Sequence, residues 1–233
     1  MTKKKILFEA CVDSLESSIA AQEGGADRLE LCADLLKGGI TPSAGTIDLV
    51  CRKVNIPVMV MIRPRGGDFC YSNYEFEEMK RDIELVKQYN VSGVVFGILN
   101  EDGTIDKERT KELIQLSSPL KITFHRAFDM TRDPFEALND LINLEVERIL
   151  TSGQEISAFK GIKLIEELVI KSKDKIIIMP GGGINENNAA EIVNRSNVKE
   201  IHGSAREKKE NGMMTTSAER IRKIKEAING RSN

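Results

Sequence analysis

The sequence has no long apolar run, no basic block and no paired cysteine motif, and each absence excludes a class of protein. Its longest apolar runs, such as residues 176–179, are far too short to span a bilayer core of about 30 Å. The 34 basic and 36 acidic residues are interspersed and leave a net charge of −2, so neither a nucleic acid nor a membrane is an expected partner. The basic residues 1–5 run straight into a strand-like stretch, with no apolar signal region. We therefore expect a cytoplasmic protein.

The four cysteines show no C-x-x-C spacing, and in a reducing cytoplasm they do not indicate a disulfide framework. Cys51 falls in the middle of a predicted helix, where a packing role is expected. Cys70 falls in the loop after the third predicted strand, where it is expected to be exposed. Cys11 and Cys32 stand at the ends of the first two predicted strands and are considered below.

Short apolar, β-branched segments alternate with amphipathic helical segments along the whole chain. The predicted strands cover residues 6–11, 28–32, 57–63, 93–97, 121–126, 148–151, 175–179 and 200–203. The predicted helices cover residues 15–23, 41–53, 74–89, 107–116, 135–143, 161–171, 186–195 and 216–228. Near-continuous apolar strands are typical of parallel sheets buried on both faces. The pattern predicts an α/β fold, a (β/α)8 TIM barrel forming one domain over residues 1–233. A doubly wound open sheet is the alternative, but it does not require eight regular units.

Polar side chains follow the predicted strands, where barrel proteins place their sites. The candidate catalytic residues are Glu9, Glu30, Arg63, His125, Asp129 and His202. Unpaired charges would cost several kcal/mol each inside the barrel, so we expect these side chains at the rim, facing solvent or a ligand. His125 and His202 are the only histidines, and both fall at strand ends, where imidazole can shuttle protons or bind metal. In an alternative reading Glu9, Glu30, Arg63 and His125 pair with one another and seal the barrel mouth.

The first two strands end in the same E-x-C pattern. Residues two apart on a strand share a face, so Glu9 projects with Cys11 and Glu30 projects with Cys32. Neighbouring strands lie about 4.8 Å apart, which brings the two thiols within reach of one soft ion. Two thiolates suit Cu(I) and would not complete a four-ligand structural zinc site. Judged by spacing alone, apolar packing is the commoner fate of two such cysteines.

Glycines after the seventh and eighth strands form a candidate anion-binding turn. It comprises Gly181, Gly182 and Gly183, together with Gly203 and Ser204. Glycine lets the backbone approach an anion with its N–H groups, and barrels often hold a phosphate at this position. The alternative is a tight turn that needs glycine only for its backbone angles.

Long segments of the chain resemble the CutC copper homeostasis family. They are EACVDS (9–14), GGADRLELC (24–32), GITPS (39–43), MIRPRGGDF (61–69), TFHRAFD (123–129), ILTSG (149–153), MPGGG (179–183) and HGSAR (202–206). The resemblance implies a cytoplasmic TIM barrel that forms a homodimer or higher homo-oligomer and takes part in copper handling. It also implies that Cu(I) binds Cys11 and Cys32. Glu145 departs from the family, whose members often have glycine before the sixth strand; the change should alter only a turn. The resemblance implies no enzymatic reaction.

Three hypotheses follow. The first is a Cu(I)-binding homeostasis protein that uses Cys11 and Cys32. The second is a barrel enzyme for a small phosphorylated or carboxylated substrate, with the anion at the glycine turn and His125, Arg63 and the two glutamates at the reacting end. The third is a scaffold that binds through its outer helices, which nothing in the surface pattern favours. The first two are compatible, since one rim can carry both thiols and an anion pocket.

Overall fold

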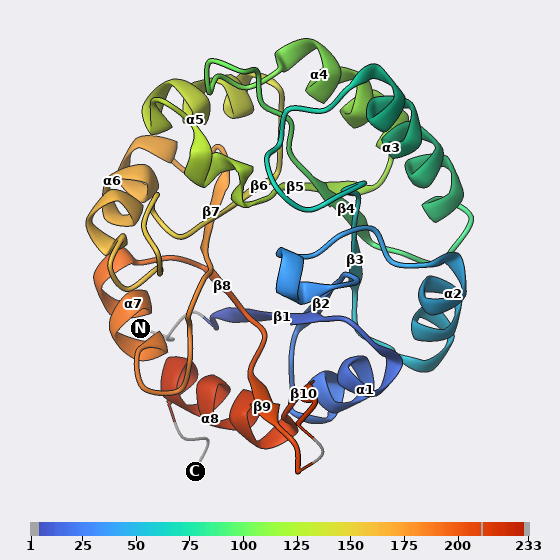
Figure 1. The fold of residues 1–233 in the computed structure, drawn as a ribbon. Helices are drawn as coiled ribbons and strands as arrows, with labels where there is room; N and C mark the ends of the chain where they lie inside the picture. Colours follow the sequence, from blue (N-terminus) through green and yellow to red (C-terminus); the bar gives the residue numbers. More distant parts are fainter. Residues whose placement is uncertain (1–4, 211, 231–233) are drawn as a thin grey trace.

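A computed structural model describes residues 5–210 and 212–230, and within them a ring of parallel strands is surrounded by helices (Figure 1). The strands are β1 (Leu7–Val12), β2 (Arg28–Leu31), β3 (Val58–Met61), β4 (Gly93–Phe96), β5 (Lys121–Phe124), β6 (Arg148–Thr151), β7 (Ile177–Pro180) and β8 (Glu200–Gly203). The hydrogen-bonded order is β7-β6-β5-β4-β3-β2-β1-β8, and β7 lies against β8 to complete the ring. The predicted (β/α)8 barrel is confirmed. Part of the basic start, residues 1–4, lies outside the described residues.

The helices follow the strands in regular alternation. They are α1 (Leu15–Glu23), α2 (Ala44–Lys53), α3 (Asn73–Val86), α4 (Lys107–Ser117), α5 (Pro134–Asn143), α6 (Ile162–Ser172), α7 (Ala189–Ser196) and α8 (Ala218–Asn229). In the described part of the chain, no helix combines the length and apolarity that a bilayer crossing requires.

Local capping chemistry sets the helix boundaries. The Ser14 side chain caps α1, and Asp133 caps α5 with Pro134 at its first turn, as their sequences indicate. Helix α2 begins later than predicted because Ser43 accepts the hydrogen bond from Thr46 N–H and so acts as the N-cap. Helix α7 also begins later, at Ala189, because Asn188 Oδ1 accepts from Asn185 N–H and holds a turn before it.

Strand alternation divides the side chains into two populations. Outward-facing residues such as Phe8 and Leu29 pack with the helices in one large core. Inward-facing residues include a separate buried cluster of Cys11, Cys32, Met59, Met61 and Val95. The registers place Cys11 opposite Glu30 and Glu9 opposite His202. Residues from β1, β2 and β8 are thereby brought to the same part of the interior.

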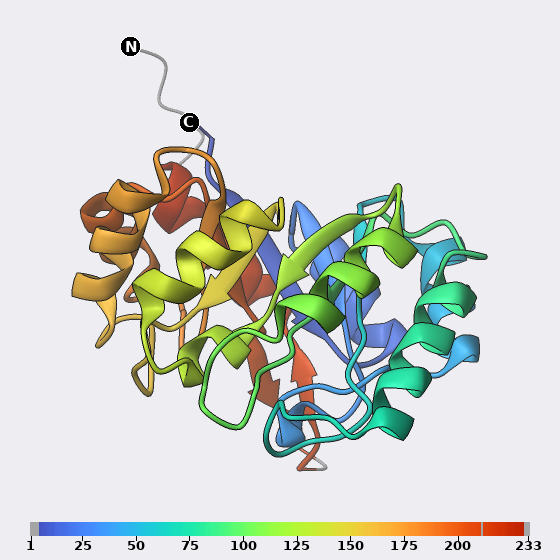
Figure 2. The same ribbon diagram turned by 90° about the horizontal axis from the view of Figure 1, so that it is seen from above.

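Short elements that were not predicted lie at the carboxyl ends of the strands. They are the 3-10 helices η1 (Leu35–Lys37) and η2 (Arg126–Met130) and the antiparallel pair β9 (Arg206–Lys208) and β10 (Met214–Thr216). Figure 2 shows η1 and the β9–β10 pair at the same end of the barrel. These elements surround the region where the polar strand ends meet.

Candidate functional site

A cavity of about 280 Å³ opens at the carboxyl ends of the strands. Many of the predicted site residues line it: Cys11, Glu30, Arg63, His125, Gly182, Gly183, His202, Gly203 and Ser204. Glu9, Cys32, Asp129 and Gly181 are not among its lining residues. The predicted site residues therefore divide into a set around the cavity and a set that supports it.

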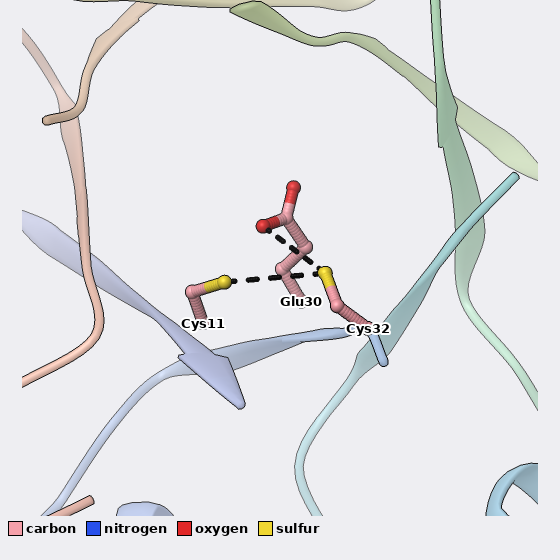
Figure 3. A group of neighbouring side chains, drawn as sticks. All are labelled: Cys11, Glu30 and Cys32. Carbon is pink, nitrogen blue, oxygen red and sulfur yellow. Dashed lines mark hydrogen bonds between the residues drawn. The ribbon is translucent and has the colours of Figure 1, made fainter. Parts of the chain in front are cut away.

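The two rim cysteines lie side by side. Cys11 Sγ is 4.0 Å from Cys32 Sγ, and the Cys32 thiol donates to Glu30 Oε2 at 3.7 Å (Figure 3). Cys11 lines the cavity, whereas Cys32 lies just behind it and is 1% exposed. The prediction that the paired E-x-C endings bring the thiols together is confirmed.

Burial and neighbouring charge keep both thiols protonated at neutral pH. The hydrogen bond with Cys32 and burial raise the pKa of Cys11 well above its ordinary value. At Cys32 the hydrogen bond with Cys11 lowers the pKa, but burial and the Glu30 carboxylate outweigh it and raise the pKa to about 11. Any cation that binds the thiolates must therefore displace protons.

Glu30 and His202 form a buried ion pair at the cavity wall. His202 Nε2 lies 2.9 Å from Glu30 Oε2 and 4.0 Å from Glu9 Oε1. Burial lowers the pKa of His202, but the charge of Glu30 outweighs it and raises the pKa well above its ordinary value. Burial raises the pKa of Glu30, and the charge of His202 outweighs it and lowers the pKa. Imidazolium and carboxylate thus stabilise each other, while Glu30 Oε1 has no partner among the described residues.

Below this pair, a charged network fills the barrel. Arg28 contacts both Glu9 and Glu200, and Arg148 donates to Glu200 at 2.6 Å. Glu9 is fully buried, deeper than the rim placement expected from the sequence. The barrel holds these charges because opposite charges are paired within it.

Three members of this network were missed in the sequence. Arg28, Arg148 and Glu200 each begin a predicted strand, where a charge at the head of an apolar run was the available signal. Glu9, Glu30, Arg63 and His125 do not pair with one another in the described structure, so the alternative of a self-sealed mouth named the wrong partners.

His125 is held as a neutral imidazole. Its Nδ1 accepts a hydrogen bond from Ala127 N–H at 3.2 Å, so the ring proton lies on Nε2. Burial, followed by the charge of Arg63, lowers the pKa of His125 to about 3. Gly97 leaves room for the ring, because a Cβ there would lie 2.6 Å from Nδ1. The Nε2–H donor has no partner among the described residues.

Arg63 is buried without a carboxylate partner in the described structure. Its terminal nitrogens donate to the carbonyl oxygens of Lys37, Gly39 and Gly67 at 2.8–3.1 Å. Its guanidinium lies 4.7 Å from the centre of the Phe69 ring, which also packs against His125 at 4.9 Å. Phe69 therefore joins Arg63 to His125, although the sequence did not single it out.

Asp129 belongs to a supporting cluster beside the cavity. It accepts from Arg126 Nε at 2.7 Å, Thr151 Oγ1 at 2.5 Å and Ser152 N–H at 3.0 Å. These contacts tie η2 to the end of β6. Asp129 thereby positions Arg126, which lines the cavity.

The glycine turn has backbone conformations that favour glycine. Gly182 has φ +100° and Gly183 has φ +72°, and both line the cavity. Gly181 has a different reason to be glycine, since a Cβ there would lie 2.4 Å from Leu150 and 3.0 Å from His202. In the described structure the N–H groups of Gly182 and Gly183 donate to no protein acceptor.

The remaining two cysteines lie elsewhere. Cys51 and Cys70 are partly buried and pack against the outer core, and all four cysteines are free. The packing expected for Cys51 is confirmed, and Cys70 is less exposed than its loop position indicated.

Fold and site together define a (β/α)8-barrel protein with two neighbouring free thiols beside a polar cavity at the carboxyl ends of its strands. The chain belongs to the CutC family, whose family model matches residues 6–207. A mouse protein named copper homeostasis protein cutC homolog is 53% identical over 207 residues, covering 89% of this chain and 76% of the mouse protein. The human protein of that name matches to the same extent.

Solved structures support the fold assignment. The crystal structure of a copper homeostasis protein CutC from Streptococcus agalactiae has a TM-score of 0.81 at 34% identity, covering 85% of this chain and 98% of that one. A phosphoribosylanthranilate isomerase from Pyrococcus furiosus has a TM-score of 0.62 at 13% identity, covering 97% of this chain and 100% of that one. At that identity the second likeness concerns the barrel fold alone.

Proposed function

We propose that this CutC-family chain binds Cu(I) through Cys11 and Cys32 and serves copper homeostasis. The observation that carries the proposal is the 4.0 Å separation of the two thiol sulfurs, which come from adjacent strands. A metal–thiolate bond is about 2.3 Å long, so sulfurs at this separation can share one ion. Thiolates are the ligands that a soft ion such as Cu(I) prefers.

The surroundings of the thiols also suit a soft ion. Met59 and Met61 belong to the same buried cluster as the cysteines. Gly39 leaves space beside the thiols, because a Cβ there would lie 3.0 Å from Cys32 Sγ. Cys11, Glu30 and Cys32 each offer a ligand atom, all within 4.8 Å of one another. The Cys32 thiol donates to Glu30 Oε2, so the carboxylate lies close to an ion held between the two sulfurs.

A competition assay tests the proposal. Wild type is expected to take about one Cu(I) per chain from a chromogenic Cu(I) chelator under anaerobic conditions, and the double variant Cys11→Ser, Cys32→Ser is expected to lose that ion because hydroxyls are poor ligands for it. The matched control is Cys51→Ser, Cys70→Ser, which removes the same number of thiols and leaves the rim pair intact. Equal Cu(I) uptake by wild type and the rim double variant would contradict the proposal.

We further propose that the chain works in the cytoplasm as a homodimer or higher homo-oligomer. The resemblance to the family carries both statements, and four free cysteines agree with a reducing compartment. Light scattering after size-exclusion chromatography measures the assembly. A monomer at all protein concentrations would contradict the oligomer.

A further inference from the structure

Several residues that line the cavity have buried polar atoms without a protein partner in the described structure. In the described structure, eight buried side-chain nitrogen or oxygen atoms lack a hydrogen bond. Four belong to residues that line this one cavity: Glu30 Oε1, Arg63 Nε, His125 Nε2 and Arg206 Nε. An unpaired buried polar atom costs about 1–3 kcal/mol, so four of them in residues around one cavity indicate that a partner is missing.

The donor or acceptor type of these four atoms indicates which kind of ligand would satisfy them. Three are N–H donors and one is a carboxylate acceptor. The complementary molecule offers several acceptor oxygens and one hydroxyl donor. A small carboxylate that also carries a hydroxyl group has this combination.

The charged side chains around the cavity favour the binding of an anion. Arg126 pairs with Asp129, Arg206 pairs with Asp13, and Glu30 pairs with His202. Arg63 alone among these cations has only uncharged partners in the described structure, namely backbone carbonyls, the Phe69 ring and the Tyr71 side chain, so its charge is uncompensated. It is 4% exposed, and a buried charge is stabilised most by an opposite charge.

The volume limits the size of the molecule. The cavity has a volume of about 280 Å³. This space accommodates a compound of a few carbon atoms.

We propose that the cavity binds a small hydroxylated carboxylate, with Arg63 and His125 donating to the carboxylate and Glu30 accepting from the hydroxyl. A phosphate attached to the same molecule is held by the N–H groups of Gly182 and Gly183, which are free in the described structure and line the cavity mouth beside Arg126. The site needs neither thiol nor a metal ion, but it shares Glu30 with the proposed Cu(I) site, whose ligand Cys11 lines the same cavity.

Calorimetric titration with D-glycerate and 3-phosphoglycerate tests the proposal, with inorganic phosphate as a third probe. Wild type is expected to bind both organic anions, and 3-phosphoglycerate at least tenfold more tightly, which is the effect of about one added charge-assisted hydrogen bond. Equal affinities would overturn the role of the glycine turn. No binding of either organic anion, or binding of inorganic phosphate alone, would overturn the carboxylate site.

Paired variants identify the donors. His125→Asn keeps an acceptor for Ala127 N–H and loses the Nε2–H donor, so it is expected to weaken D-glycerate binding by roughly tenfold or more. His125→Gln places an amide donor near the Nε2 position and is expected to recover part of that loss. Unchanged affinity in His125→Asn would overturn the proposal.

The arginines of one loop supply a second matched pair. Arg63→Gln removes the uncompensated charge and is expected to abolish D-glycerate binding. Arg65→Gln changes a neighbouring arginine that already pairs with Asp68 and Glu75, so binding should stay within about twofold of wild type. If Arg63→Gln does not fold, the His125 pair still decides the question. Because the two sites share Glu30, the thiols and His125 are tested separately. Retained D-glycerate binding in Cys11→Ser, Cys32→Ser would show that the carboxylate site needs no thiol, and its loss would overturn that statement. Retained Cu(I) binding in His125→Asn would show that failure of the carboxylate site leaves the Cu(I) site intact.

Discussion

The two histidines line one cavity in opposite electrostatic surroundings. His202 contacts the Glu30 carboxylate, and its positive form is stabilised. His125 lies near Arg63 and donates to no described group, and its neutral form is stabilised. His202 thus places a cation at the cavity, and His125 places an uncharged hydrogen-bond donor there.

His125 should make the protein less stable as pH falls. Its pKa is about 3 in the folded protein and about 6.5 in the unfolded chain, so between these values only the unfolded chain binds the proton. Stability contributed by the neutral ring is therefore present above pH 6.5 and is lost as pH falls, by up to about 1.4 kcal/mol per pH unit. His125→Asn cannot titrate there. Urea unfolding between about pH 6 and pH 4 is expected to show a shallower pH dependence for the variant; identical slopes would contradict the assignment.

Two helices end in the same way with different residues. After α1, Gly25 N–H donates to Gln22 O and Ala26 N–H donates to Ala21 O. After α5, Glu145 N–H donates to Ile142 O and Val146 N–H donates to Leu141 O. Both are Schellman motifs, which place the residue after the C-cap in the left-handed region. Gly25 has φ +87° and Glu145 has φ +59°. Glu145, where family members often have glycine, thus lies in a turn, as expected. Glycine suits this position because the turn requires a positive φ.

Introducing glycine at position 145 and removing it at position 25 should therefore change the free energy of unfolding in opposite directions. Glu145→Gly is expected to raise the free energy of unfolding by about 0.5–1 kcal/mol, because glycine adopts a positive φ without steric cost. Gly25→Ala is expected to lower it by about 1 kcal/mol. A Cβ at Gly25 meets nothing within 4 Å, so the backbone conformation alone causes that loss. Thermal and urea unfolding measure both. A destabilising Glu145→Gly would show that the Glu145 side chain makes a compensating contact.

At the scale of the whole molecule, the barrel is closed internally by charges as well as apolar side chains. Arg28 and Arg148 converge on Glu200, and Arg28 also reaches Glu9. Burial raises the pKa of Glu200, but its hydrogen bonds to Arg148 and Arg28 outweigh this and lower the pKa. The network joins β1, β2, β6 and β8 across the interior below the cavity.

Removing the shared carboxylate should destabilise the whole barrel. Glu200→Gln leaves two buried guanidinium groups without their common counter-charge and is expected to cost about 3–5 kcal/mol. The control Glu166→Gln breaks an exposed pair with Arg195 and should cost about 0–1 kcal/mol. Urea unfolding measures both. Similar small losses in the two variants would show that the network does not support the fold.

The sequence by itself determined the barrel, the face shared by Cys11 and Glu9, and the meeting of the two thiols. These follow from periodicity and from the spacing of adjacent strands, which are local properties. Two helices begin a few residues later than predicted, because Ser43 caps α2 and because the Asn188 side chain holds a turn before α7.

Only the tertiary structure decided which charges pair and which remain without partners. Glu9 and Arg28 are 19 residues apart and Arg28 and Glu200 are 172 apart, so no local pattern relates them. The same holds for Arg63 and His125, which are joined through Phe69. Electrostatic energies depend on distance and burial, which become defined only when the barrel closes. When the barrel closes, most charged side chains in its interior form ion pairs, whereas Arg63 at the cavity has no opposite charge beside it in the described structure.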